Sequence, residues 1–132
     1  MKRIILGLSL LLMLVQNGFA ETDAEYDKLI MNSTSNLHKQ MYRCLRSAFN
    51  HPTTSNPDIC IKVLDIAKKD NVKLSKDDIS ETYLKSAVLY YSSKKDYIKA
   101  YEYWMKSAKL GNTTAQSNLD VLCKEHSWVC KR

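Results

Sequence analysis

Apolar residues recur every three or four positions along most of this chain, a spacing that predicts a series of amphipathic helices. The sequence contains only three glycines and two prolines, and it shows no strong strand-like alternation of apolar and polar residues. These observations predict an all-α fold. The apolar stripes of three successive segments are Leu37, Met41, Cys44, Leu45 and Ala48; Cys60, Val63, Leu64 and Ala67; and Ile79, Tyr83, Ala87, Tyr90 and Tyr91.

Polar residues separate these stripes and mark the helix ends. Residues 51–57 contain both prolines, and residues 70–75 form a polar turn. Ser75 is followed three residues later by Asp78, a spacing typical of a helix start. Further helices are expected over residues 24–32 and 113–124, with a C-terminal tail after them.

Residues 95–112 predict one complete helix with both ends encoded. Asp96 can cap the start, because its short side chain can accept from unpaired N–H groups of the first turn. Gly111 can end the helix, because glycine adopts the left-handed conformation without a steric penalty. The residues at helical spacing between these ends are Ala100, Tyr101, Trp104 and Ala108.

A longer pattern of small and aromatic residues surrounds this helix. It consists of Ala87-Val88-Leu89-Tyr90-Tyr91, Lys95-Asp96-Tyr97-Ile98-Lys99-Ala100, Tyr103-Trp104-Met105-Lys106-Ser107-Ala108, Gly111-Asn112, Ala115 and Leu119. Over residues 83–120 this pattern resembles a Sel-like repeat, a subclass of the tetratricopeptide-like α/α repeats. The chain departs from that family at residues 92–94, where a Gly-rich turn is usual, and at Ser107, where Ala is preferred.

The resemblance implies a short α/α superhelix of about two helix pairs with a capping helix. A degenerate earlier copy is expected over residues 37–71, because Ala67 and Ala108 align at an offset of 41 residues, as do Asn71 and Asn112. The residues expected to form the repeat core are Ala87, Tyr90, Ala100, Tyr101, Trp104, Ala108, Gly111, Ala115 and Leu119.

The first twenty residues have the pattern of a secretory signal peptide. A basic start is followed by an apolar run over residues 4–15 and by small residues at Gly18 and Ala20. The run is shorter than the about 20 apolar residues that a membrane-spanning helix needs. We therefore expect cleavage before Glu21 and export to the bacterial periplasm, or secretion. Residues 21–132 would form a single helical repeat domain.

The four cysteines are Cys44, Cys60, Cys123 and Cys130. An even number of cysteines in an exported chain predicts disulfides, and four cysteines allow three pairings. We expect Cys44–Cys60 and Cys123–Cys130, because each pair closes a short local loop. Each bridge should contribute about 2–4 kcal/mol of stability.

Catalytic and metal-binding motifs are not evident. The sequence has no G-x-S-x-G, no H-E-x-x-H, no phosphate-binding Gly loop and no C-x-x-C. Removing Lys2 and Arg3 lowers the formal net charge from +6 to about +4, and the remaining charges are mixed along the chain. We expect no metal, no cofactor, no nucleic-acid partner and no enzymatic activity.

Tyrosines are the strongest candidates for contact with a partner. Eight tyrosines and two tryptophans occur in the chain, and most lie within residues 83–104. Because neighbouring residues on a helix point in different directions, they cannot all face inward. Exposed tyrosine is favoured at protein interfaces. The predicted partner-binding residues are Tyr91, Tyr97 and Tyr103.

Together, the resemblance, the export signal and the small size favour a periplasmic immunity or inhibitor protein. Such a protein would bind a toxic effector, for example one delivered by type VI secretion. One alternative is a general envelope adaptor or a secreted virulence factor. A second is an enzyme, because some cysteine-rich Sel-like repeat proteins are described as β-lactamases. For that reading, Ser92 lies three residues before Lys95, but the other required elements are missing.

Overall fold

The computed structural model describes residues 22–33, 35–50 and 56–131. Within these ranges every regular element is a helix, which confirms the predicted all-α fold. The predicted signal peptide lies outside the described residues. The elements are α2 (Asp23–Asn32), α3 (Asn36–Asn50), the 3-10 helix η1 (Pro57–Ile59), α4 (Lys62–Lys69), α5 (Lys76–Leu89), the π-helical turn η2 (Tyr90–Lys94), α6 (Tyr97–Lys109), α7 (Thr113–Glu125) and α8 (Ser127–Cys130).

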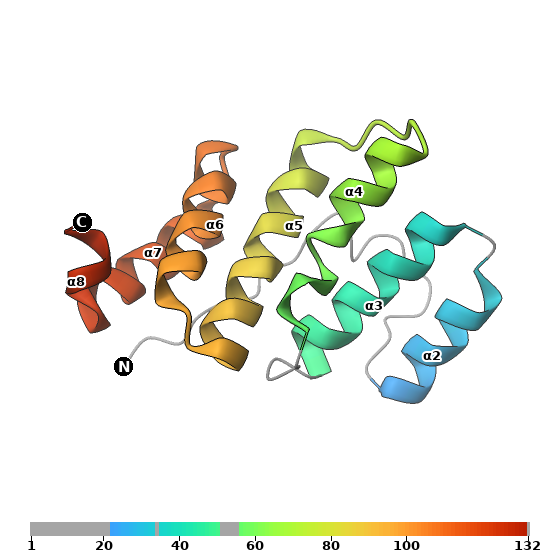
Figure 1. The fold of residues 1–132 in the computed structure, drawn as a ribbon, viewed down its shortest axis with the longest axis horizontal. Helices are drawn as coiled ribbons and strands as arrows, with labels where there is room; N and C mark the ends of the chain where they lie inside the picture. The colour runs from blue at the N-terminus through green and yellow to red at the C-terminus, as the bar shows by residue number, and fades with distance from the viewer. Residues whose placement is uncertain (1–21, 34, 51–55, 132) are drawn as a thin grey trace.

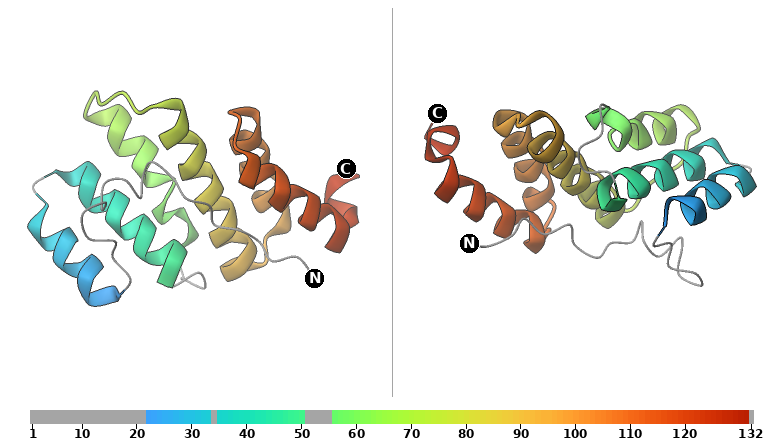
Figure 2. Two further views of the ribbon diagram at one scale, coloured as in Figure 1. Left: turned by 180° about the vertical axis from the view of Figure 1, so that it is seen from behind. Right: turned by 90° about the horizontal axis from the view of Figure 1, so that it is seen from below.

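Consecutive helices pack side by side in a row from α2 at one end to α8 at the other (Figure 1). The views from behind and from below show the same neighbours and a curved stack (Figure 2). The pairs α3–α4 and α5–α6 form the short α/α superhelix that the sequence predicts, with α2 packed before them on α3. The expected C-terminal tail contains one further short helix, α8.

The two expected disulfides are present. Cys44 of α3 is bonded to Cys60, which follows η1, and their Cα atoms are 4.6 Å apart. Cys123 of α7 is bonded to Cys130 of α8, with 5.6 Å between the Cα atoms. The first bridge ties α3 to the start of α4, and the second holds α8 against α7. The local pairing that loop length favoured is therefore confirmed.

The predicted helix starts are also confirmed. The Ser75 hydroxyl accepts from the backbone N–H of Asp78 at 3.0 Å, and the Asp96 carboxylate accepts from that of Lys99 at 3.0 Å. Each bond satisfies an N–H group that has no partner within the helix.

Gly111 ends α6 in the left-handed conformation that the sequence predicted, with φ of +94°. Its N–H donates to the carbonyl of Ala108, and the next N–H donates back to the carbonyl of Ser107. Helix α4 ends in the same way at Asn71, whose φ is +55°, and there the next N–H donates to the carbonyl of Ala67.

These equivalent helix ends correct the internal alignment of the sequence. Asn71 corresponds in conformation to Gly111 and not to Asn112, so the offset between the two helix ends is 40 residues and not 41. Ala67 is therefore the counterpart of Ser107. The sequence alignment matched two Asn letters, whereas the position is defined by a left-handed backbone that either Asn or Gly can adopt.

Apolar side chains form two core clusters that meet at α5. The first cluster gathers α2, α3, η1 and α4, and the second gathers the helices from α5 onward. Most of the predicted repeat core is buried, whereas Tyr101 and Ala108 are half-buried at its edge and Gly111 is exposed. The predicted core residues that are buried are Ala87, Tyr90, Ala100, Trp104, Ala115 and Leu119.

Helix α5 differs from the single apolar stripe that the sequence predicted. Ile79 and Tyr83 of that stripe are only half-buried, whereas Leu84 and Val88 are buried outside it. The reason is that α5 packs against α3 and α4 on one side and α6 on the other, so most of its surface is covered. The covered surface includes five polar residues, which are Ser80, Glu81, Thr82, Lys85 and Ser86.

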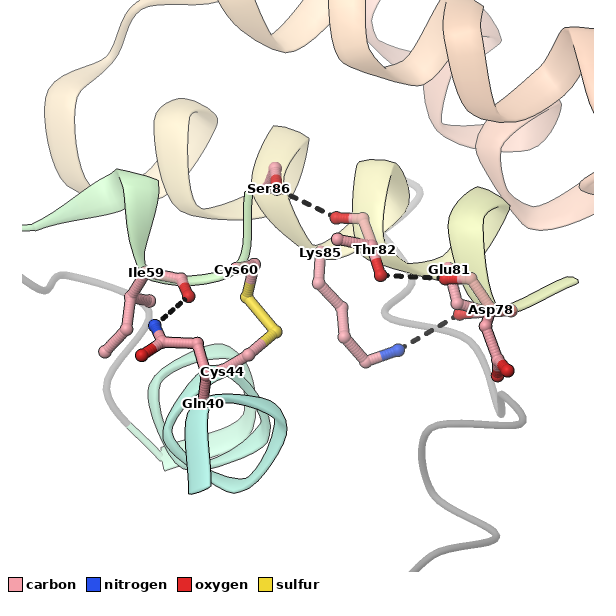
Figure 3. Close-up of a disulfide and its surroundings, with 9 residues drawn as sticks. All are labelled: Gln40, Cys44, Ile59, Cys60, Asp78, Glu81, Thr82, Lys85 and Ser86. Atoms are coloured by element: carbon pink, nitrogen blue, oxygen red, sulfur yellow. Dashed lines mark hydrogen bonds and ion pairs between the residues drawn. A yellow bond between two sulfur atoms is a disulfide. The ribbon is translucent and has the colours of Figure 1, made fainter. Parts of the chain in front are cut away.

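Two of these polar residues form a buried ion pair beside the Cys44–Cys60 disulfide (Figure 3). The Lys85 side chain is fully buried, and its Nζ lies 3.0 Å from Oε2 of Glu81 one turn earlier. The other carboxylate oxygen of Glu81 accepts from the Asn112 amide at 3.1 Å. Burial lowers the pKa of Lys85, and the adjacent Glu81 opposes that shift. The pair is thus held in place from both α5 and the start of α7.

Substituting Lys85 with Met should lower the free energy of unfolding by about 3–5 kcal/mol, because the buried Glu81 carboxylate loses its cation. Adding Glu81→Gln to Lys85→Met should recover part of this loss, because glutamine carries no charge and still accepts from Asn112. Denaturant unfolding of the two variants and the parent chain measures both effects. A loss below about 1 kcal/mol for Lys85→Met would contradict the buried-pair interpretation.

The backbone conformation of Lys95 predicts how substitution with glycine changes stability. Lys95 adopts a left-handed conformation with φ of +49°, directly after the π-helical turn η2. That conformation costs a non-glycine residue roughly 1–2 kcal/mol. Lys95→Gly should therefore leave stability unchanged or raise it by up to about 1 kcal/mol. Lys94→Gly, the matched control inside the helical turn, should lower stability by about 0.5–1 kcal/mol in thermal unfolding. Equal losses for the two variants would refute the assignment.

Candidate functional site

The three predicted partner-binding tyrosines do not share one surface. Tyr91 and Tyr97 lie toward α8, whereas Tyr103 lies on another face of α6, next to α5. All three are half-buried and pack against the second core cluster. The side chains around them form two groups: the terminal aromatic cluster of Tyr91, Tyr97, Trp104 and His126, and the outer aromatic cluster of Tyr83, Tyr90 and Tyr103.

The terminal aromatic cluster holds the C-terminal turn against α6. The Tyr97 ring is stacked on the His126 ring, with 3.8 Å between centroids and 18° between planes. The Tyr91 ring lies 5.4 Å from that of Tyr97, and its hydroxyl donates to Glu125 at 2.9 Å. The Cys123–Cys130 disulfide closes the chain on either side of His126. Much of the surface of Tyr91 and Tyr97 is therefore covered by contacts within the protein.

This environment also perturbs ionisation of the Tyr91 hydroxyl. Burial, followed by the hydrogen bond to Glu125, raises the pKa of Tyr91 to about 12. Both effects favour the neutral phenol, because a phenolate would be poorly solvated and would face a carboxylate.

The outer aromatic cluster is built from both α5 and α6. Tyr83 and Tyr103 are stacked, with 5.9 Å between centroids and 20° between planes, and the Tyr90 ring lies 5.7 Å from that of Tyr103. The Tyr90 hydroxyl donates to Asp58 of η1. Burial raises the pKa of Tyr103, and the carboxylate of Asp58 adds to that shift.

Two lysines lie on the faces of these rings. Lys106 Nζ is 5.4 Å from the Tyr83 centroid and 5.5 Å from that of Tyr103. Lys99 Nζ is 5.4 Å from the Tyr90 centroid. Such cation–π contacts orient an ammonium group and contribute about 0.5–1 kcal/mol at exposed sites. The outer aromatic cluster thus combines the half-buried rings of Tyr83 and Tyr103 with two exposed lysines.

The placement of two lysines beside Tyr103 could be read from the sequence, whereas the rest of the outer aromatic cluster could not. Lys99 and Lys106 lie four residues before and three residues after Tyr103, so helical geometry places them on one face. Tyr83 and Asp58 come from other elements, and no local pattern connects them to α6. The predicted partner-binding residues therefore included Tyr103 but not Tyr83 or Asp58.

Neither metal binding nor membrane spanning is indicated by the part of the chain that the structure describes. In these ranges no group of three or more His, Cys, Asp or Glu side chains is placed to hold a metal ion. None of the helices there is long and apolar enough to cross a membrane.

No family model, curated protein or solved structure matches this chain. The resemblance of residues 83–120 to a Sel-like repeat therefore stays a prediction from the residue pattern.

The pKa of Tyr91 makes a testable contribution to alkaline stability. The unfolded phenol ionises near pH 10, whereas the folded phenol keeps its proton up to a pKa of about 12. The stabilisation is therefore fully present below pH 10 and is lost as the pH rises toward 12. In Tyr91→Phe, the free energy of unfolding should decline less steeply over this interval than in the parent chain.

Denaturant unfolding at several pH values between 9 and 12 gives the comparison. Tyr101→Phe on α6 is the matched control, because it removes a hydroxyl from a neighbouring half-buried tyrosine. An identical pH dependence in Tyr91→Phe and the parent chain would show that the Tyr91 proton is not linked to folding.

Proposed function

We propose that this protein is an exported protein-binding module that acts as an immunity or inhibitor protein in the bacterial periplasm. Its partner would be a toxic effector, for example one of type VI secretion, and binding would block the effector's active site. The observation that carries the proposal is the outer aromatic cluster, whose rings are fixed by stacking and by lysines before any partner binds. Rigid tyrosines give binding area at a low cost in side-chain entropy.

The disulfides and the paired helices support the same function. Two disulfides staple the helical stack, and such bridges are typical of proteins that fold in an oxidising compartment. That compartment agrees with the predicted signal peptide. The paired helices also suit membership of the Sel-like repeats, which resemble adaptor modules that scaffold other proteins.

Co-purification tests the proposal directly. The full chain, tagged at its C-terminus, would be expressed together with the product of the neighbouring gene and recovered from the periplasm under oxidising conditions. We expect one enzyme-like partner in a 1:1 complex, and we expect the activity of that partner to be lost in the complex. Several substoichiometric partners would instead favour a general envelope adaptor. Recovery of no partner would count against an immunity protein paired with its neighbour.

The two aromatic clusters should differ in their contribution to this complex. Tyr103→Ala should weaken partner binding at least about tenfold, because truncating an interface tyrosine commonly costs more than 1 kcal/mol. Tyr97→Ala is the matched control on the same helix, and it should lower stability with little effect on affinity, because the Tyr97 ring is covered by His126.

Calorimetric titration measures the affinities, and thermal unfolding identifies any loss of fold. A greater loss of affinity in Tyr97→Ala than in Tyr103→Ala, with both variants folded, would place the binding surface at the terminal aromatic cluster instead.

A further inference from the structure

Five exposed lysines lie along α6 and the turn before it. They form what we call the α6 basic stripe, which consists of Lys94, Lys95, Lys99, Lys106 and Lys109. Glu102 is the only acidic residue within α6, so the stripe carries a clear excess of positive charge. The ion pairs found among the described residues, Arg46–Asp23, Arg46–Asp27 and Lys85–Glu81, include none of its lysines.

Helical geometry aligns the stripe along one side of α6. Lys99, Lys106 and Lys109 follow at intervals of seven and three residues, which keeps them on the same face. At 1.5 Å per residue, α6 extends about 18 Å from Tyr97 to Lys109. The Cα atoms of Lys99 and Lys106 are separated by two helical turns, roughly 11 Å along the axis.

The two central lysines of the stripe contact aromatic rings. Lys99 lies over the Tyr90 ring, and Lys106 lies over the Tyr83 and Tyr103 rings. Ordering a free lysine at an interface normally costs side-chain entropy, and the ring contacts meet part of that cost before binding.

We propose that the α6 basic stripe docks an acidic segment of a protein partner, whose carboxylates meet Lys99 and Lys106. This inference rests on the proposed protein-binding function and adds the chemistry of the partner. Charge complementarity favours such a partner, because the five lysines of the stripe outnumber Asp96 and Glu102, the two acidic residues within residues 94–109. Nucleic acid fits less well, since its bases bind single-stranded sites by stacking on exposed aromatic faces. In the outer aromatic cluster, lysines occupy those faces.

An NMR titration with defined probes tests the docking chemistry. The oxidised mature chain, labelled with ¹⁵N, is titrated with hexaglutamate at low salt, with hexaserine as the uncharged control peptide. A single-stranded hexanucleotide tests the other class of ligand. We expect hexaglutamate to shift amide signals mainly within residues 94–109, and hexaserine to shift none. Uniform shifts at all surface lysines, or tighter binding of the oligonucleotide at the stripe, would overturn the proposal.

Charge reversal separates this site from net charge alone. Lys99→Glu combined with Lys106→Glu should weaken hexaglutamate binding more than tenfold. The control pair Lys68→Glu and Lys69→Glu makes the same change in charge at two exposed lysines of α4, and should alter binding less than twofold. Equal effects of the two pairs would overturn the proposal.

The same two variant pairs separate this inference from the proposed function. If co-purification identifies an inhibited enzyme that still binds the Lys99→Glu, Lys106→Glu variant with unchanged affinity, the docking inference fails and the proposed function stands. If hexaglutamate binds at the stripe but no inhibited enzyme is found, the immunity function fails and the docking chemistry stands.

Discussion

Helix α5 is covered on both sides, and its polar side chains must find partners inside the protein. A buried polar group without a partner costs about 1–3 kcal/mol, and a buried charge costs more. The Glu81–Lys85 ion pair avoids the largest of these costs, because each buried charge has an opposite charge 3.0 Å away. Thr82 and Ser86 donate to carbonyls four residues earlier in the same helix. Thus α5 can be buried only if this polar arrangement is complete.

The neighbouring helices α6 and α7 are positioned by the same requirement. The Ser107 hydroxyl of α6 donates to the Ser80 carbonyl of α5 at 2.7 Å, within a fully covered contact. This bond gives the buried Ser107 hydroxyl a partner in the contact between α5 and α6. Asn112 serves two elements, because its oxygen accepts from the backbone N–H of Ala115 and its nitrogen donates to Glu81. The start of α7 and the buried charge of α5 are therefore fixed by one side chain.

The two faces of α6 divide structural and candidate binding roles. On one face, the disulfide-closed turn around His126 packs on Tyr97 and Tyr91, which stabilises the end of the stack. On the other face, Tyr103 belongs to a surface that carries ordered lysines. The proposals for a protein partner, and for acidic chemistry in that partner, both follow from this second face.

Features that depend on near neighbours in the chain could be predicted from the amino-acid sequence. Helical periodicity, the caps at Ser75 and Asp96, the left-handed Gly111 and the two short disulfide loops involve residues within one element or one connection. The burial of α5 on both sides, and the placement of Tyr91 and Tyr103 on different surfaces, became evident only from the packing of the helices. Those outcomes depend on which helices pack together, and a stripe pattern describes one helix at a time.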